Sequence, residues 1–285
     1  MASHRPVFFY QKVTTIPTEP SAREQLLNTY VNEIRTRFSS GGRVSSPSHR
    51  LKEALISLAM FGYGNDVVAP NPEYQRTFEG FQTILRTVLP PVLGFQRLHI
   101  EMPEVVIETD TGSFSLDAVS GGVSAILDMA WQIYMYSTVH DEFCVVIDEP
   151  ENHLHPELQQ TLLPSLLKAF PTAQFTIATH NPFMVSSVPD SHVYVLQFER
   201  DNRVTSQLLD TVNKAGTSND ILRDVLGLAF TMPLWAEQQL EALVTRYSQM
   251  GLTEQSLAQL RAELAELGMS HVVPETLSRV IDETE

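Results

Sequence analysis

The sequence predicts an α/β fold with a mainly parallel sheet, a helical insertion and a helical tail. Two observations carry this prediction. The segment from 143 to 178 alternates between an apolar strand, a helix and a second apolar strand, which is the pattern of a parallel sheet. Residues 21 to 90 instead repeat apolar side chains at helical spacing, between joints rich in Gly, Ser and Pro. With 285 residues, 43% of them apolar, the chain can bury a substantial core.

The first half of the chain combines a strand, three helices and a small meander. Residues 7 to 15 are rich in β-branched and aromatic side chains and predict a strand that ends before Pro17. Ser21 and Glu24 form a capping-box pattern at the start of the first helix. Apolar residues at helical spacing predict helices over 21 to 38, 49 to 61 and 73 to 89. Short runs over 95 to 116, separated by turn residues, predict an antiparallel meander.

The second half contains the parallel sheet. Residues 123 to 138 are apolar on nearly every side of a helix, so this helix is expected to be buried, with Met129, Trp131, Met135 and Tyr136 in the core. Apolar strands at 143 to 147 and 174 to 178 flank a helix at 156 to 170, and this βαβ unit predicts a sheet covered on both faces. Strands expected to close the sheet are predicted over 192 to 198 and 204 to 209, and helices of the tail from about 218, 233, 253 and 274.

The composition narrows the possible functions. The chain has 19 Lys and Arg against 34 Asp and Glu, a net charge of −15, which disfavours a long open groove for nucleic acid. A local basic strip would have few members, namely Arg35, Arg37, Arg43, Arg50 and Lys52. The single cysteine, Cys144, cannot form a disulfide framework, which indicates a reducing compartment. Because no apolar stretch reaches the roughly 18 residues of a membrane span, we expect a cytoplasmic protein without a membrane partner.

Two consecutive carboxylates, Asp148 and Glu149, end the first apolar strand of the parallel sheet. Ligands bind at the carboxyl ends of parallel strands. Neighbouring strand residues point to opposite sides, so Asp148 could hold Mg²⁺ while Glu149 orients and deprotonates an attacking water. The alternative is that the acidic pair merely caps the turn before the helix at 156.

A histidine and a glycine-containing turn add to this edge. His180 follows the second apolar strand and could donate to a phosphate oxygen or to the attacking water. Ser120, Gly121 and Gly122 precede the buried helix, where a hydroxyl and backbone N–H groups can bind an anion. Each feature alone has a simpler interpretation, because histidines often cap strand ends and Ser-Gly-Gly often starts a helix.

A zinc site is a weaker alternative. His140, Cys144, His153 and His155 lie near one another in the sequence, but they are too few and too loosely spaced for a structural zinc site.

The order of these motifs over residues 116 to 198 resembles the carboxyl-terminal half of ABC-type P-loop ATPases, in the branch of AAA-family enzymes shared by OLD-like, recombination and SMC-type ATPases. The resemblance implies that Ser120 to Gly122 are the signature motif, which contacts the nucleotide of the opposite protomer. It implies that Asp148 is the Walker B magnesium ligand and Glu149 the catalytic base. By the same resemblance, Asn152 to His155 are the D-loop, His180 is the switch histidine and Gln11 is the Q-loop glutamine.

The sequence departs from this family in one respect. The 285 residues contain no Walker A motif, Gly-x-x-x-x-Gly-Lys-Ser/Thr, whose amides and lysine cradle the phosphates. We therefore expect the carboxyl-terminal part of an ABC-type ATPase head, with a missing N-terminal lobe. The expected regions are 1 to 20 for a strand of the incomplete lobe, 21 to 93 for the helical insertion, 94 to 210 for the ATPase motifs and 211 to 285 for the tail.

The expected function is ATP binding and hydrolysis with Mg²⁺ in a dimer of heads, in DNA metabolism or anti-phage defence. Walker A would come from the missing lobe or another chain, and a nuclease or toxin is a possible partner; contact with nucleic acid stays open. One alternative is a non-catalytic subunit that offers its signature motif in trans. Another is a metal-dependent hydrolase that acts without nucleotide. The tail lacks the Asp-x-Asp motif of a TOPRIM nuclease, so we expect no nuclease activity in this chain.

Overall fold

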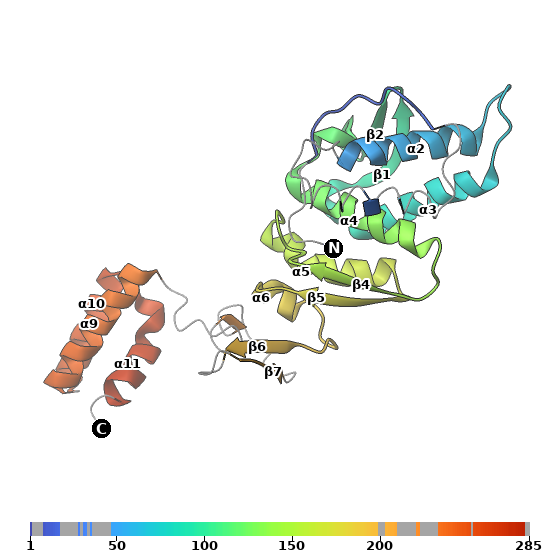
Figure 1. The fold of residues 1–285 in the computed structure, drawn as a ribbon. Coiled ribbons are helices and arrows are strands. Elements are labelled where there is room, and N and C mark those ends of the chain that lie inside the picture. Colours follow the sequence, from blue (N-terminus) through green and yellow to red (C-terminus); the bar gives the residue numbers. More distant parts are fainter. Residues whose placement is uncertain are drawn as a thin grey trace. The chain divides into compact units, whose positions relative to one another are not determined.

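The computed structural model divides the chain into two compact units, Met1–Ser218 and Asn219–Glu285 (Figure 1). The residues that the structure describes are 1, 8–17, 28, 31–32, 35, 47–198, 203–209, 221–222, 233–251 and 253–282.

Two helices of the insertion pack side by side in the first unit. They are α2 (Pro47–Tyr63) and α3 (Pro72–Val88), and they confirm the helices predicted over 49 to 61 and 73 to 89. The side chain of Asn71 caps α3 by accepting from the backbone N–H of Glu73, and Pro72 begins the helix. The helix predicted over 21 to 38 lies mostly outside the described residues, including Ser21 and Glu24; Asn28, Val31, Asn32 and Arg35 are helical.

An antiparallel meander follows the insertion, as predicted. A short 3-10 helix, η1 (Pro91–Leu93), leads into β1 (Phe95–Glu101), β2 (Glu104–Thr109) and β3 (Gly112–Ser115), which pair in that order. A second 3-10 helix, η2 (Leu116–Ala118), then leads to the next long helix. In Figure 1 the meander lies beside α2 and α3.

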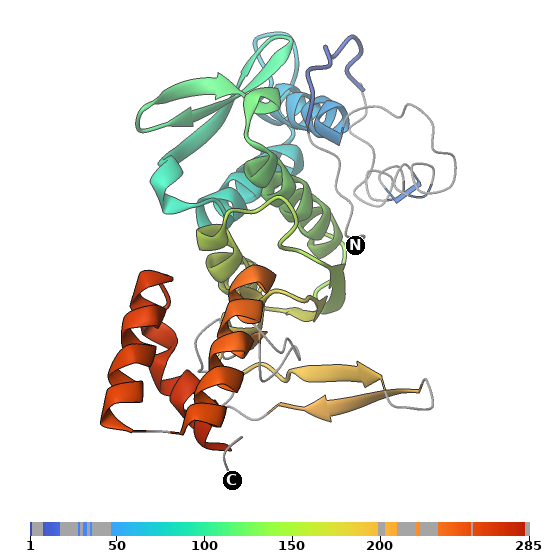
Figure 2. The ribbon, with the colours of Figure 1, turned by 90° about the vertical axis from the view of Figure 1, so that its left-hand side faces the viewer.

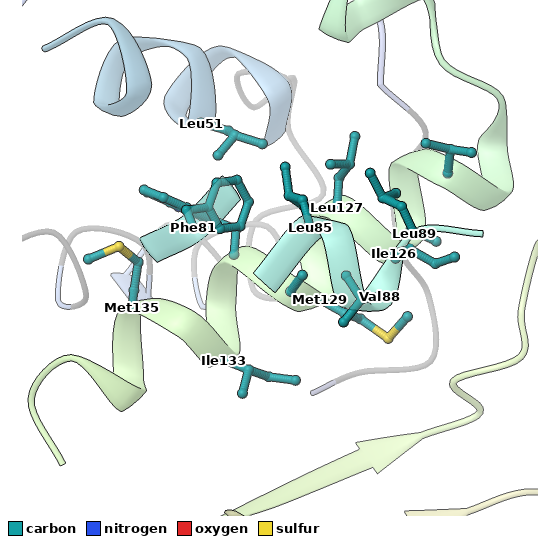
Figure 3. Close-up of a cluster of buried hydrophobic side chains, with 14 of the residues drawn as sticks. Leu51, Phe81, Leu85, Val88, Leu89, Ile126, Leu127, Met129, Ile133 and Met135 are labelled. Atoms are coloured by element: carbon teal, nitrogen blue, oxygen red, sulfur yellow. The ribbon is translucent and has the colours of Figure 1, made fainter. Parts of the chain in front are cut away.

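The core of the first unit forms around helix α4 (Gly121–Ser137). Figure 3 shows Phe81 and Leu85 of α3 among Ile126 and Met129 of α4. The Phe81 and Trp131 rings meet edge to face, with centroids 4.9 Å apart. Burial of Met129, Trp131 and Met135 confirms the predicted core. Tyr136 was wrongly predicted to be buried, because it lies near the end of α4 and is 38% exposed.

The predicted βαβ unit is confirmed. Strand β4 (Phe143–Asp148) runs parallel to β5 (Ala173–Ala178), with α5 (Pro156–Ala169) between them in the sequence. The register places Asp148 beside Ala178, so both strands end at the same edge. A short helix, α6 (Pro182–Ser186), follows β5.

Coverage of this sheet differs from the prediction. Val145 and Ile147 are buried, but Val146 between them is 59% exposed, and Thr176 of β5 is also exposed. The prediction that both faces are covered is therefore wrong for this chain. Along the edge of β4 opposite β5, the described hydrogen-bond partner is Met1. Its N-terminal amine donates to the carbonyl oxygen of Val146, and its carbonyl oxygen accepts from the N–H of Asp148.

The last two strands do not close the sheet. Strands β6 (Tyr194–Phe198) and β7 (Val204–Leu208) confirm the strands predicted over 192 to 198 and 204 to 209. They form a separate antiparallel pair, however, which contradicts the prediction that they close the parallel sheet. A short connection lets antiparallel neighbours pair directly, whereas a parallel partner would need a long crossover.

The described part of the N-terminal segment, residues 8 to 17, is not a strand. Phe8 to Pro17 contain neither strand nor helix, so the prediction over 7 to 15 is wrong for its described part. The apolar side chains of Phe8 and Val13 join the core, and Ser48 and Ser57 of α2 donate to backbone oxygens of this segment. Packing against α2 replaces a strand ladder.

The second unit contains α9 (Leu234–Met250), α10 (Glu254–Glu266), η4 (Ser270–Val272) and α11 (Val273–Asp282), visible at the red end of the chain in Figure 2. These helices confirm those predicted from about 233, 253 and 274, and they share their own apolar core. The helix predicted near 218 lies outside the described residues except for 221–222. Within the described helices, none combines the length and apolar character needed to cross a bilayer.

Candidate functional site

The carboxyl ends of β4 and β5 bring three of the predicted residues to one edge. Asp148 is the last residue of β4, Glu149 follows it, and His180 lies just beyond β5. The Nδ1 atom of His180 is 3.2 Å from Oε1 of Glu149. Both side chains are accessible, His180 at 75% exposed and Glu149 at 35%. A histidine and a carboxylate in this geometry can share or pass a proton.

Glu149 is held by its backbone as well as by its side chain. Its N–H donates to the carbonyl oxygen of Ala178 at 2.8 Å, which continues the ladder between the two strands. Its φ angle is 44°, a left-handed conformation that costs a residue with a Cβ about 1–2 kcal/mol. The side chain of Asn152 donates to Oε2 of Glu149 at 2.9 Å. Each carboxylate oxygen of Glu149 therefore has a neighbour that fixes its direction.

The segment predicted to be the D-loop connects this edge to α5. His155 caps α5, because its Nδ1 accepts from the N–H of Glu157 at 3.4 Å. His153 has a φ angle of 71°, so the backbone turns sharply before the helix. Asn152 contacts the candidate base, as described above.

The predicted signature residues lie at the start of α4. The hydroxyl of Ser120 accepts from the N–H of Val123 at 3.4 Å, so Ser120 is the N-cap and is exposed. A Cβ on Gly122 would come 3.2 Å from the carbonyl oxygen of His153, so a side chain here would press on the D-loop segment. The structure thus places the helix start of Gly121 and Gly122 beside residues 153 and 154.

Gln11 lies apart from these residues in sequence and is half-buried in the segment 8–17, rather than at the end of a strand. Its neighbour Tyr10 has its ring 5.2 Å from Nζ of Lys52. Lys52 is fully buried and contacts Glu104 at 3.0 Å and Asp117. Lys52 therefore cannot belong to a basic strip on the surface, contrary to the prediction.

The donor set at this edge fits Mg²⁺ better than zinc. Magnesium is usually held by one or two carboxylates together with phosphate oxygens and water, and the exposed carboxylate of Asp148 suits that role. Within the described part of the chain, no group of three or more His, Cys, Asp and Glu side chains is placed to hold a metal ion. This gives no support to a zinc site at His140, Cys144, His153 and His155.

Sequence reasoning missed two residues of this edge, Glu151 and Thr179. Glu151 is 5% exposed, and its carboxylate accepts a hydrogen bond from the hydroxyl of Thr179. Their positions after two neighbouring parallel strands could have indicated that they meet, but nothing in the sequence shows that Glu151 is buried.

Comparison with known proteins places the chain in a family. The family model described as "AAA domain, putative AbiEii toxin, Type IV TA system" matches residues 23–186, more than half of the chain. The Septu protein PtuA of Bacillus mycoides (strain KBAB4) is 25% identical over 232 residues, which cover 68% of this chain and 31% of that protein. The Retron Vc95 probable ATPase of Vibrio cholerae serotype O1 biovar El Tor is 32% identical over 108 residues, 37% of this chain and 20% of that protein.

Among solved structures, the SMC head domain from Thermotoga maritima has a TM-score of 0.39 and 14% identity, and the match covers 55% of this chain and 52% of that one. The matched regions span less than a third of the two relatives named above. The family model covers the insertion, the signature segment, β4, β5 and the segment of His180. The parallel strands and their helices confirm the α/β fold class. The family model and the two relatives confirm the resemblance to an ABC-type P-loop ATPase. The chain belongs to the AAA domain family that this model describes.

Proposed function

We propose that the chain is part of an ABC-type ATPase that binds and hydrolyses ATP with Mg²⁺ as a dimer of heads. The observation that carries this proposal is the contact of 3.2 Å between His180 and Glu149, beside Asp148, at the carboxyl edge of the parallel strands. Septu and retron proteins among the relatives support a role in anti-phage defence, with DNA metabolism as the broader context.

The proposed roles follow from position. Asp148 would hold Mg²⁺, which neutralises charge on the transferred phosphoryl group. Glu149 would accept a proton from the attacking water, since its carboxylate is accessible and fixed in direction by Asn152. His180 would orient Glu149 or donate to a phosphate oxygen. Ser120 and the N–H groups of Gly121 and Gly122 would bind the nucleotide of the opposite head, at the amino terminus of α4. Gln11 is retained as the proposed Q-loop glutamine.

The phosphate cradle would come from a Walker A lobe, located upstream or on another chain. The exposed face of the parallel sheet, which carries Val146 and Thr176, supports this proposal. Parallel sheets are normally covered on both faces, yet Val146 is 59% exposed, and the only described strand paired with β5 is β4. A lobe that adds a strand beside β5 and covers this face would complete the sheet.

The pairing of Glu149 and His180 also distinguishes the alternatives. A non-catalytic subunit that only offers Ser120 in trans would not need a base fixed by two neighbours. A hydrolase that acts without nucleotide would be active on its substrate in the absence of ATP.

The test is a Glu149→Gln variant in an assembly with the Walker A lobe restored. Glutamine keeps the shape of the side chain but cannot accept the proton, so hydrolysis should fall by about 10²–10⁴-fold while ATP binding is retained. The matched control is Glu142→Gln, an exposed carboxylate at the other end of β4. Normal turnover in Glu149→Gln would remove Glu149 from the role of base.

A further inference from the structure

Glu151 is a buried carboxylate within the catalytic edge that the proposed roles do not use. It is 5% exposed, although the segment around it connects a strand to a helix at the surface. Its Oε1 accepts a hydrogen bond from the hydroxyl of Thr179, whereas its Oε2 is buried and has no hydrogen-bond partner among the described residues. Burying a carboxylate is costly unless it makes strong hydrogen bonds, so this side chain has a specific task.

The partner of Glu151 belongs to the segment that carries His180. The Thr179 hydroxyl accepts from the N–H of Asn181 at 3.0 Å while it donates to Glu151. The side chain of Asn181 donates to Gln159 of α5 at 2.9 Å and accepts from the N–H of Phe183 at 2.8 Å. His180 therefore lies between two residues whose side chains are both anchored.

Glu151 also belongs to the segment that carries the candidate base. It lies two residues after Glu149, and its carbonyl oxygen accepts from the N–H of Leu154 at 2.9 Å. Asn152, the next residue, bonds Glu149 with both its side chain and its N–H. One partly buried hydrogen bond between the side chains of Thr179 and Glu151 thus joins the segment of Glu149 to the segment of His180.

Direct attraction between Glu149 and His180 is too weak to set their separation. His180 is 75% exposed, and polar contacts between solvent-exposed side chains contribute little to stability. A hydrogen bond from a hydroxyl to a buried carboxylate is shorter and about twice as strong as one between neutral groups. The position of His180 relative to Glu149 must therefore come from the segments that carry them.

We infer that Glu151 and Thr179 are positioning residues that fix the distance between Glu149 and His180. The inference concerns the structure of the edge, and its catalytic consequence rests on the proposed function. Neither residue needs to touch nucleotide, because both act through the segments next to them.

The first test uses the full chain without nucleotide. Thr179→Val removes the donor. Amide hydrogen exchange is followed at Asn152 and Leu154, which belong to the other segment and whose N–H groups donate to the carbonyl oxygens of Glu149 and Glu151. We expect faster exchange at both amides. Thr179→Ser, which keeps the hydroxyl, should restore slow exchange. Thr161→Val, which removes an exposed hydroxyl from α5, is the matched control and should change neither amide. Unchanged exchange at Asn152 and Leu154 in Thr179→Val would overturn the inference.

The second test measures ATP hydrolysis in the assembly with the Walker A lobe. Misplacement of a catalytic group by about 1 Å lowers rates by about a hundredfold, so Thr179→Val should lower kcat about ten- to hundredfold with little change in KM. The effect should vanish in a Glu149→Gln background, because the pair acts through that base. Equal losses in both backgrounds would contradict positioning. An assembly without any ATPase activity would instead refute the proposed function, and the exchange test would still decide the inference.

Discussion

Lys52 is buried, although lysine side chains usually lie at the surface. The sequence suggested an exposed cation, but its ammonium group is fully buried between the carboxylates of Glu104 and Asp117. Asp117 belongs to η2, three positions before Ser120, so this ion cluster joins α2 to the segment that leads into the proposed signature motif. Only tertiary packing brings these three residues together, which is why sequence reasoning could not find them.

Lys52→Met should destabilise the first unit by about 3–5 kcal/mol, because the buried carboxylate of Asp117 and the partly buried carboxylate of Glu104 lose their counter-ion. Urea unfolding of the full chain measures this loss. The double variant Lys52→Met with Asp117→Leu should recover part of the lost stability, since the unpaired carboxylate of Asp117 is removed. A loss below about 1 kcal/mol in the single variant would show that the cluster is solvated.

Phe81→Ala should cost about 3–5 kcal/mol, since Phe81 is 0% exposed and removing its ring leaves a cavity beside Trp131. The matched control is Val92→Ala, because Val92 is 88% exposed and its removal leaves no cavity. Thermal unfolding of both variants provides the comparison. Equal stability of the two would contradict the packing between α3 and α4.

The carboxyl group of Glu79, on α3, makes the stability of the fold depend on pH. Hydrogen bonds from Gln75 and then Tyr63 lower the pKa of its carboxyl below the ordinary value. A carboxyl with a lowered folded-state pKa stabilises the fold above its unfolded pKa, and this contribution is lost as the pH falls through the folded pKa. Tyr63→Phe should therefore raise the pKa of Glu79 measured by NMR, whereas Tyr74→Phe, the control, should leave it in place. An unchanged pKa of Glu79 in Tyr63→Phe would contradict the hydrogen bond from the Tyr63 hydroxyl to Glu79.

At the scale of elements, the helices and the βαβ unit could be predicted because their periodicity is local. The edge of Asp148, Glu149 and His180 was predictable for the same reason, since parallel strands end together. The strand at 7 to 15 was not, because β-rich composition does not supply a pairing partner. The continuous apolar run of β4 indicates two covered faces, but no element of the described part of the chain covers Val146 on one of them.

Because one face of β4 is exposed, substitutions on its two faces should have different effects on stability. Val146→Lys should leave the stability of the full chain within about 0.5 kcal/mol of the wild type, as for other exposed positions, because the side chain is 59% exposed. Ile147→Lys, one position on, should prevent folding, because that side chain is 0% exposed. In the assembly, Val146→Lys should weaken association with the Walker A lobe. Chemical denaturation and co-purification measure the two effects, and normal association would show that the lobe does not cover this face.

At the scale of the whole molecule, the chain consists of two units with separate cores. The helical tail was predictable from its spacing, but its buried centre was not, because residues such as Tyr247 look equally suited to a surface. Burial, followed by the bond to Glu263, raises the pKa of Tyr247 above its ordinary value. The proposed boundaries at 20, 93 and 210 remain predictions, whereas the structure separates the units at Ser218.

The measurement that tests the central claim most directly is Mg-ATP binding and hydrolysis, by calorimetry and phosphate release. It should be made on the purified chain and on the chain with its Walker A lobe restored. We predict weak or absent binding by the chain alone, and binding with turnover in the complete assembly that Glu149→Gln abolishes. Tight binding and turnover by the chain alone, lost in Glu149→Gln, would contradict the claim that this edge is half of a nucleotide site.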